Sequence, residues 1–151
     1  MRRLDRKISD DEAVEILQKG EFGVLSMSSP NNEGYGIPLN YAFDNNKIYF
    51  HCALEGSKLN YLKNNNKVSF CVVGRTELLP SKFGTAYESV IVSGIITEVE
   101  EEEKKDALLR IIEKYSSSHI PKGKKYIDKS HKDVNVIKLT ISLISGKARK
   151  K

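Results

Sequence analysis

Residues 36–74 read GIPLNYAFDNNKIYFHCALEGSKLNYLKNNNKVSFCVVG, and this stretch decides the fold. Over residues 47–52, and again over 67–73, apolar and polar residues alternate with the period of a β-strand that faces a core on one side. Between them, residues 56–64 have the spacing of a short helix, with Ser57 as a possible N-cap. The stretch therefore predicts strand, helix and strand in close succession.

The same patterns predict six strands along the whole chain. Turn residues and polar loops separate the strands, and helices flank them. The strands are predicted at residues 22–28, 35–43, 47–52, 67–73, 87–99 and 133–144, and the helices at 9–20, 56–64 and after the acidic run 98–103. Helices do not alternate regularly with strands, which argues against a parallel sheet. We predict a mainly β protein, a six-stranded antiparallel split β-barrel (Greek key) with peripheral helices.

Individual residues indicate local details of this barrel. Ser9 and Glu12 form a capping box for the first helix. Pro38 has no N–H to give to a sheet, so its strand is expected to be irregular there or to lie at an edge. Gly94 predicts a bulge or a close approach of two strands. Residues 75–84 and the polar segment after Tyr115 are expected to be loops.

The composition is that of one globular domain. The 151 residues are 39% hydrophobic and 30% charged, enough to bury a core. No apolar run reaches the ~20 residues that span a bilayer and no signal peptide is evident, so we expect a cytoplasmic protein with no membrane partner. The net charge of +5 falls to +1 without the four cations of residues 147–151. We expect residues 1–146 to form the domain, residues 147–151 to be a disordered basic tail, and nucleic acid not to bind.

One cluster of residue types suits an anion. His51 ends a strand, and a short loop leads to Ser57 and Lys58 at a helix start. N–H groups at a helix N-terminus attract anions, and a serine hydroxyl and a lysine add a donor and a charge. By itself this leaves two interpretations open, a phosphate site or an ordinary helix start. His51, His119 and His131 lack the spacing of metal ligands, so no metal site is predicted.

The stretch above, together with YESVIVSGIITEVE at residues 87–100, resembles the FMN-binding split-barrel proteins related to pyridoxamine phosphate oxidase. It is most similar to their nitroimidazole-resistance (Nim) branch. The resemblance rests on GIPLNY at 36–41, on IYFH at 48–51 followed by GSKL at 56–59, and on YESVIVSG at 87–94. It implies a homodimer with FMN at the interface, where both chains contribute to each pocket. The arginine-rich strand and the C-terminal arginine motif of the true oxidase are missing, so pyridoxamine phosphate oxidation is not expected.

The resemblance also implies roles for individual residues. Ser57 and Lys58 match the turn that binds the phosphate, and Ser89 matches a polar residue that holds the phosphate or the ribityl chain. Residues 38–40 match the strand whose backbone runs along the isoalloxazine ring. His51 matches a strand end that faces the flavin and is associated with the active site, the alternative being a hydrogen-bonded wall of the pocket. The expected cofactor contacts are Pro38, Leu39, Asn40, His51, Ser57, Lys58, Tyr87 and Ser89.

Two functions follow from this resemblance. The first is a reductase that takes electrons from NAD(P)H or another reductant and passes them to a small nitroaromatic or quinone-like acceptor, with His51 as the catalytic group. The second is a flavin- or haem-binding protein without turnover of its own. In that case His51 is a candidate axial ligand, because neutral imidazole binds haem iron.

Overall fold

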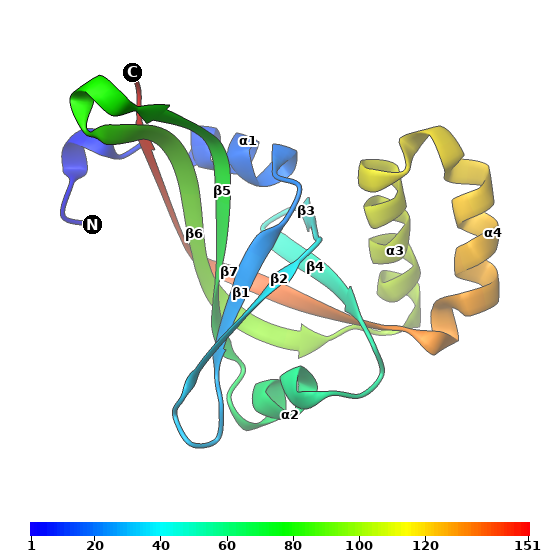
Figure 1. The fold of residues 1–151 in the computed structure, drawn as a ribbon. Helices are drawn as coiled ribbons and strands as arrows, with labels where there is room; N and C mark the ends of the chain where they lie inside the picture. Colours follow the sequence, from blue (N-terminus) through cyan, green and yellow to red (C-terminus); the bar gives the residue numbers. More distant parts are fainter.

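Seven strands form one antiparallel sheet that curls into a split barrel (Figure 1). The computed structural model describes all residues 1–151. The strands are β1 (Gly23–Ser28), β2 (Gly34–Leu39), β3 (Ala42–Asp44), β4 (Lys47–Cys52), β5 (Lys67–Leu79), β6 (Gly84–Glu98) and β7 (Asn135–Arg149). Their order in the sheet is β2-β1-β5-β6-β7-β4-β3. β2 and β3 are consecutive in the chain but lie at opposite edges of the sheet, so no ladder closes the barrel between them.

Tyr41 explains why the structure has seven strands where the sequence predicts six. Residues 35–43 were expected to form one strand, but Tyr41 divides it into β2 and β3. Its side chain is fully buried. Its N–H donates to the Tyr115 hydroxyl at 3.0 Å, and its carbonyl accepts from Lys114 at 3.2 Å. With both backbone groups bound to side chains of α3 (Glu101–Tyr115), Tyr41 does not join a strand ladder.

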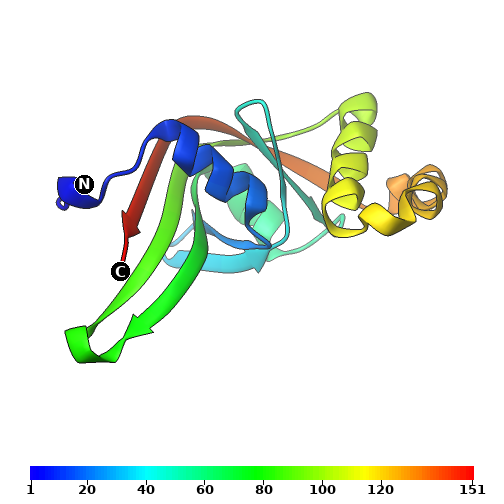
Figure 2. The same cartoon turned by 90° about the horizontal axis from the view of Figure 1, so that it is seen from above.

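The core fills the inside of the curled sheet. α1 (Asp10–Lys19) lies across one end of it, as seen in Figure 2, and buries Ala13, Ile16 and Leu17 there. The capping box of Ser9 and Glu12 is present, which confirms the predicted start of this helix. The largest fully buried side chains come from α1, the β2–β3 connection and five strands: Tyr41, Phe50, Phe70, Leu17, Leu25, Ile48, Ile137, Leu139, Val72, Val90, Val92 and Val136.

β5 and β6 extend beyond the barrel as a long hairpin arm (Figure 2). Residues 75–84 were predicted to be a loop, which is wrong, because β5 continues to Leu79 and only a single 3₁₀ turn separates it from β6. A register shift between Val73 and Thr76 interrupts the alternation of residues along β5, so the sequence pattern does not indicate that the strand continues. Gly94 lies at a second register shift, and a Cβ there would collide with the Thr140 carbonyl oxygen, which confirms the predicted bulge.

β7 also runs further than expected. Lys147 lies opposite Ser89 in the β6–β7 ladder, and Arg149 lies opposite Tyr87. Residues 147–149 therefore continue a strand where the sequence led us to expect a disordered tail. Gly146 precedes these residues, and a side chain there would collide with Ile8 and Ala13, which pack against its backbone.

A hairpin of two helices lies beside the barrel, with α3 and α4 side by side (Figure 1). The polar segment after Tyr115 was predicted to be a loop, which is wrong, since it contains α4 (Ile120–Ser130) between two 3₁₀ turns. α4 buries only Ile127, so its apolar stripe is too short to detect, and contact with α3 stabilises it. The remaining helix, α2 (Ser57–Asn64), lies at the lower end of the barrel in Figure 1. No helix has the length and hydropathy to cross a membrane.

Candidate functional site

The N-terminus of α2 carries free hydrogen-bond donors. Its N-cap residue is Gly56, which has φ 148°, and no side chain caps the helix. Ser57 was a predicted cap but is instead the first helical residue, and its hydroxyl makes no hydrogen bond within the chain. No acidic residue lies in the first turn, and space is open around Gly56. These features fit a bound phosphate group, because the helix N–H groups, an exposed hydroxyl and Lys58 are all available to it.

His51 lies close to this helix start. It pairs with Val136 of β7, and its side chain points away from the barrel core because Phe50 and Cys52 point inward. The ring is exposed on one side, yet burial of the rest of it and the charge of Lys58 lower its pKa below 6.5. A neutral imidazole beside an anion seat can accept or deliver a proton, and it can ligate iron.

A second group of predicted residues lies on β6. Tyr87 and Ser89 share the outer face of the sheet with Lys147. The Lys147 ammonium is 5.7 Å from the centre of the Tyr87 ring, and the nearby cationic groups of Arg6 and Lys147 lower the pKa of the Tyr87 hydroxyl. Sequence reasoning missed Arg6 and Lys147, although the alternation of small and charged residues after Ser145 could have extended β7 to include Lys147. This end of the sheet is cationic and suits an anion.

The predicted β2 residues lie near that same end. Pro38 is exposed and pairs with Val24, while the Leu39 side chain packs on the core and offers only its backbone. Asn40 follows the strand and lines a cavity together with Lys114. Burial lowers the pKa of Lys114 to about 8. Lys114 is a third residue that sequence reasoning missed, since nothing in its local pattern distinguishes it from the exposed lysines of a helix.

One protomer does not bring these groups together. His51 lies opposite Val136, whose neighbour Ile137 pairs with Glu98 of β6. Ser89 lies nine residues before Glu98 in β6, a distance of roughly 30 Å along the strand. The candidate anion site at the N-terminus of α2 and the cationic end near Ser89 are therefore at opposite ends of the sheet. A pocket built from both needs residues from two chains.

The outer face of the sheet between these ends carries exposed apolar side chains interspersed with serines. Its side chains come from β1, β5, β6 and β7 and lie on neighbouring rows of the ladder. They are Val24, Val73, Ile91, Ile95 and Leu143, with exposed fractions of 38 to 64%. Several exposed apolar side chains grouped on one face of a small domain are typical of a protein–protein interface.

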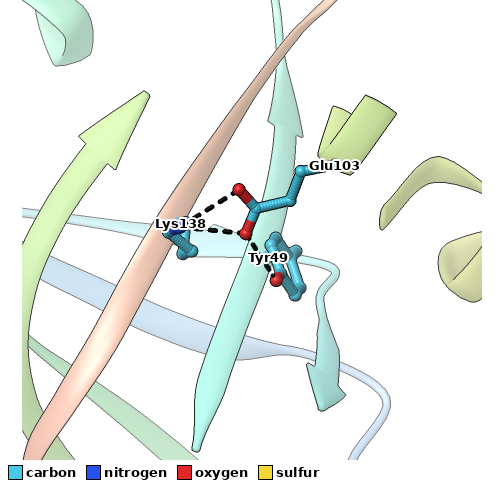
Figure 3. Close-up of polar contacts among 3 residues, drawn as sticks. All are labelled: Tyr49, Glu103 and Lys138. Atoms are coloured by element: carbon cyan, nitrogen blue, oxygen red, sulfur yellow. Dashed lines mark hydrogen bonds and ion pairs between the residues drawn. The ribbon is translucent and has the colours of Figure 1, made fainter. Parts of the chain in front are cut away.

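The helical hairpin is fixed to the barrel by a polar cluster (Figure 3). The Tyr49 hydroxyl donates to Glu103 at 2.9 Å, and Lys138 donates to both carboxylate oxygens of Glu103 at 2.9 and 3.1 Å. Burial and the bond to Glu103 raise the pKa of Tyr49, and the hydrogen bond from Lys138 is the main cause of the lowered pKa of Glu103. Because Tyr49 and His51 project from the same face of β4, this cluster sets where the hairpin lies relative to His51.

Solved structures with the same fold are known from several bacteria. A protein assigned to 5-nitroimidazole antibiotic resistance in Bacteroides thetaiotaomicron has a TM-score of 0.82 and 23% identity, over 94% of this chain and 86% of that one. An FAD-binding protein of Mesorhizobium loti has a TM-score of 0.68 and 21% identity, over 96% and 98%. An FAD and haem binding protein of Mycobacterium smegmatis has a TM-score of 0.84 and 12% identity, over 97% and 74%.

At these identities the structures establish the fold alone, and a search of curated proteins gave no significant match. The sequence profile of the family described as pyridoxamine 5'-phosphate oxidase, however, matches residues 9–148, nearly the whole chain. The chain belongs to the pyridoxamine 5'-phosphate oxidase family.

Proposed function

We propose that this protein is an FMN-dependent reductase that works as a homodimer and reduces a small nitroaromatic or quinone-like acceptor. The observation that carries the proposal is the uncapped N-terminus of α2, which presents Ser57 and Lys58 and whose Lys58 charge acts on the imidazole of His51. Structures of the same fold are described as binding FAD, or FAD and haem, and one is assigned to nitroimidazole resistance. They support a flavin as the cofactor class.

The residues divide the binding of FMN between two chains. Ser57, Lys58 and the first N–H groups of α2 would hold the phosphate. The outer-face residues of the second chain, Ser89 with Lys147 nearby and the backbone of residues 38–40, would complete the pocket. The exposed apolar face of the sheet supplies the dimer interface that this arrangement requires.

His51 would act on the acceptor. When bound, FMN supplies the transfer of electrons between a reduced donor such as NAD(P)H and the acceptor. Burial and the Lys58 charge lower the pKa of His51, which favours the neutral form of its ring. It is therefore suited to orient the acceptor by a hydrogen bond and to exchange a proton with it.

An absorption spectrum of the purified protein, followed by anaerobic titration with NADH and NADPH, tests this proposal. A flavin spectrum that bleaches on titration and recovers when nitrobenzene or a benzoquinone is added supports a reductase. His51→Ala should then lower turnover and leave most FMN binding intact. A protein that binds no flavin, or whose reduced flavin does not react with either acceptor, contradicts the proposal.

Haem binding is the second candidate, because His51 presents a neutral and exposed imidazole. A Soret band in the purified protein that disappears in His51→Ala would favour it over the reductase.

A further inference from the structure

The tip of the β5–β6 arm presents an aromatic side chain to solvent. Phe83 is 98% exposed, the largest exposed fraction among the large hydrophobic residues of the chain. Its φ is 48°, in the left-handed region that bulky side chains rarely adopt. With almost no contact to its own chain, the ring does not stabilise this conformation. Strained residues of this kind cluster at functional sites and clamps, and a binding partner for the ring would explain both observations.

Leu78 extends the exposed apolar surface along the arm. Thr76 pairs with Tyr87 and Leu78 pairs with Thr85, so Leu78 lies on the same outer face of the sheet as Tyr87. Leu78 is 75% exposed. The exposed apolar side chains of the outer face therefore continue beyond the barrel onto the arm. A partner that covers this face would also meet the arm.

A half-open apolar pocket lies on the outer face at the other end of the molecule. It is formed by the two helices of the α3–α4 hairpin and the end of β4, has a volume of about 190 Å³, and six of its nine lining residues are hydrophobic. The hairpin packs on the outer face, because Ala107 of α3 clusters with Tyr49, which shares that face of β4 with His51. We call this the α3–α4 pocket.

The arm and the α3–α4 pocket cannot meet within one chain, since they lie at opposite ends of the molecule (Figure 2). A two-fold dimer with outer faces in contact runs the two β6 strands in opposite directions, so the Ser89 end of one lies over the Glu98 end of the other. Phe83 lies six residues beyond Ser89, roughly 20 Å along the strand. In the partner, α3 begins at Glu101, directly after β6 ends. The arm of one chain therefore extends toward the helical hairpin of the other.

We propose that Phe83 of each chain inserts into the α3–α4 pocket of its partner. The symmetry of the dimer repeats the contact, so both arms bind across it. An apolar cavity of about 150 Å³ can hold benzene, so a phenyl ring fits this pocket, and the open side lets it enter. The inference rests on the homodimer of the proposed function and deepens it. His51 forms part of the pocket wall, so the arm of the partner would cover that side of its ring.

A tryptophan at the arm tip tests the contact, because the chain has no tryptophan of its own. We expect Phe83→Trp to form a dimer in which acrylamide quenches the tryptophan less than half as efficiently as in Lys82→Trp, the neighbouring exposed position. Dilution that dissociates the dimer should remove this protection. Tyr126→Asp, which places a charge at an exposed position of the pocket lining, should remove it as well.

Phe83→Gly gives a second test without a bulky reporter. Glycine adopts the left-handed conformation without strain, so the arm should fold as before. Loss of the ring should raise the dimer dissociation constant about tenfold or more, measured by sedimentation. Lys82→Gly is the matched control and should leave the constant unchanged.

Several results would overturn the inference. They are a monomeric protein, a dimer in which the tryptophan of Phe83→Trp is quenched as readily as that of Lys82→Trp, protection that survives Tyr126→Asp, and an unchanged dissociation constant in Phe83→Gly. The absorption spectrum of the same samples reports flavin separately. A protected arm tip in a dimer that binds no flavin therefore refutes only the proposed function, whereas a flavin-binding dimer with an unprotected tip refutes only this inference.

Discussion

The Tyr49 hydroxyl on β4 donates a 2.9 Å hydrogen bond to the Glu103 carboxylate on α3. Tyr49 is buried, whereas Glu103 reaches it from the first turn of its helix. This bond joins the barrel to the helical hairpin two residues from His51 on the same face of β4. It therefore connects the stability of the hairpin to the shape of the candidate site.

Tyr49→Phe should loosen the hairpin without unfolding the barrel. The change removes one hydrogen bond and leaves the ring packed, so the expected loss is about 1 kcal/mol. Hydrogen exchange should become faster in α3 and α4, while the amides of β5 and β6 keep their protection. Equal acceleration in both regions would show that the bond does not act locally.

The same cluster should make the hairpin sensitive to acid. Because the pKa of Glu103 is lowered in the folded protein, its contribution to stability is complete above its unfolded pKa of about 4.3 and is lost as the pH falls through the folded value. Hairpin exchange rates should therefore rise below about pH 4.3 in wild type. Glu103→Gln removes this titration, so a pH profile identical to that of wild type would contradict the assignment.

Lys58→Gln should raise the pKa of His51. Burial and the Lys58 charge both lower it, and the substitution removes only the second cause. Since the folded pKa of His51 lies below its unfolded value of about 6.5, stability is complete above pH 6.5 and declines as the pH falls towards the folded pKa. A two-dimensional NMR titration of the histidine rings measures the shift, and His119 serves as an internal control. An unchanged His51 titration in Lys58→Gln would show that the two groups do not interact.

Patterning alone was sufficient to predict most of the barrel. The alternation in β4, the capping box at Ser9 and the bulge at Gly94 are local signals, and each is found in the structure. The missed elements depend on distant contacts. Tyr41 breaks its strand because Tyr115, more than seventy residues away in the sequence, binds its backbone, and α4 forms because α3 lies beside it.

The candidate site could be predicted only in part, for a similar reason. Ser57 and Lys58 lie together at one helix start, so adjacency in sequence places them in one site. Lys147 lies near Tyr87 because of the register in which β6 and β7 pair, and no local sequence pattern predicts that register. The roles of all eight predicted residues are still predictions that the measurements described here would test.

Gly123→Ala should destabilise the helical hairpin. A Cβ at Gly123 would overlap the Ile112 side chain, where α4 packs against α3. The overlap should cost about 1–3 kcal/mol, partly offset by the gain of about 1 kcal/mol in helix propensity. In an Ile112→Ala background the same change should be neutral or stabilising, which gives a coupling energy in a double-mutant cycle measured by urea unfolding. Additive effects would rule out this contact as the cause.

Lys114 should be distinguished from the other lysines by its chemistry. Its ammonium lies 3.6 Å from the centre of the Tyr41 ring, and burial lowers its pKa to about 8. At pH 8 a large share of Lys114 should therefore be a neutral amine, which reacts with an amine reagent such as acetic anhydride. Competitive labelling followed by mass spectrometry measures its pKa. Because the folded pKa is the lower one, stability should rise with pH between about 8 and the unfolded value of about 10.4. Lys114→Met should abolish that rise, and a labelling pKa equal to that of the exposed Lys19 would contradict the prediction.

Mixed dimers should decide whether each flavin site takes residues from two chains. Lys58→Glu places a negative charge at the proposed phosphate seat, and Lys147→Glu places one at the far end of the sheet, so each homodimer should bind FMN at least tenfold more weakly than wild type. If a site combines Lys58 of one chain with Lys147 of its partner, a heterodimer of the two variants has one site with both defects and one with neither. Co-refolding equal amounts should then restore about a quarter of the sites, because half of the dimers are heterodimers in a random mixture of a two-fold assembly. If both residues act within one chain, every site keeps a defect and no FMN binding returns.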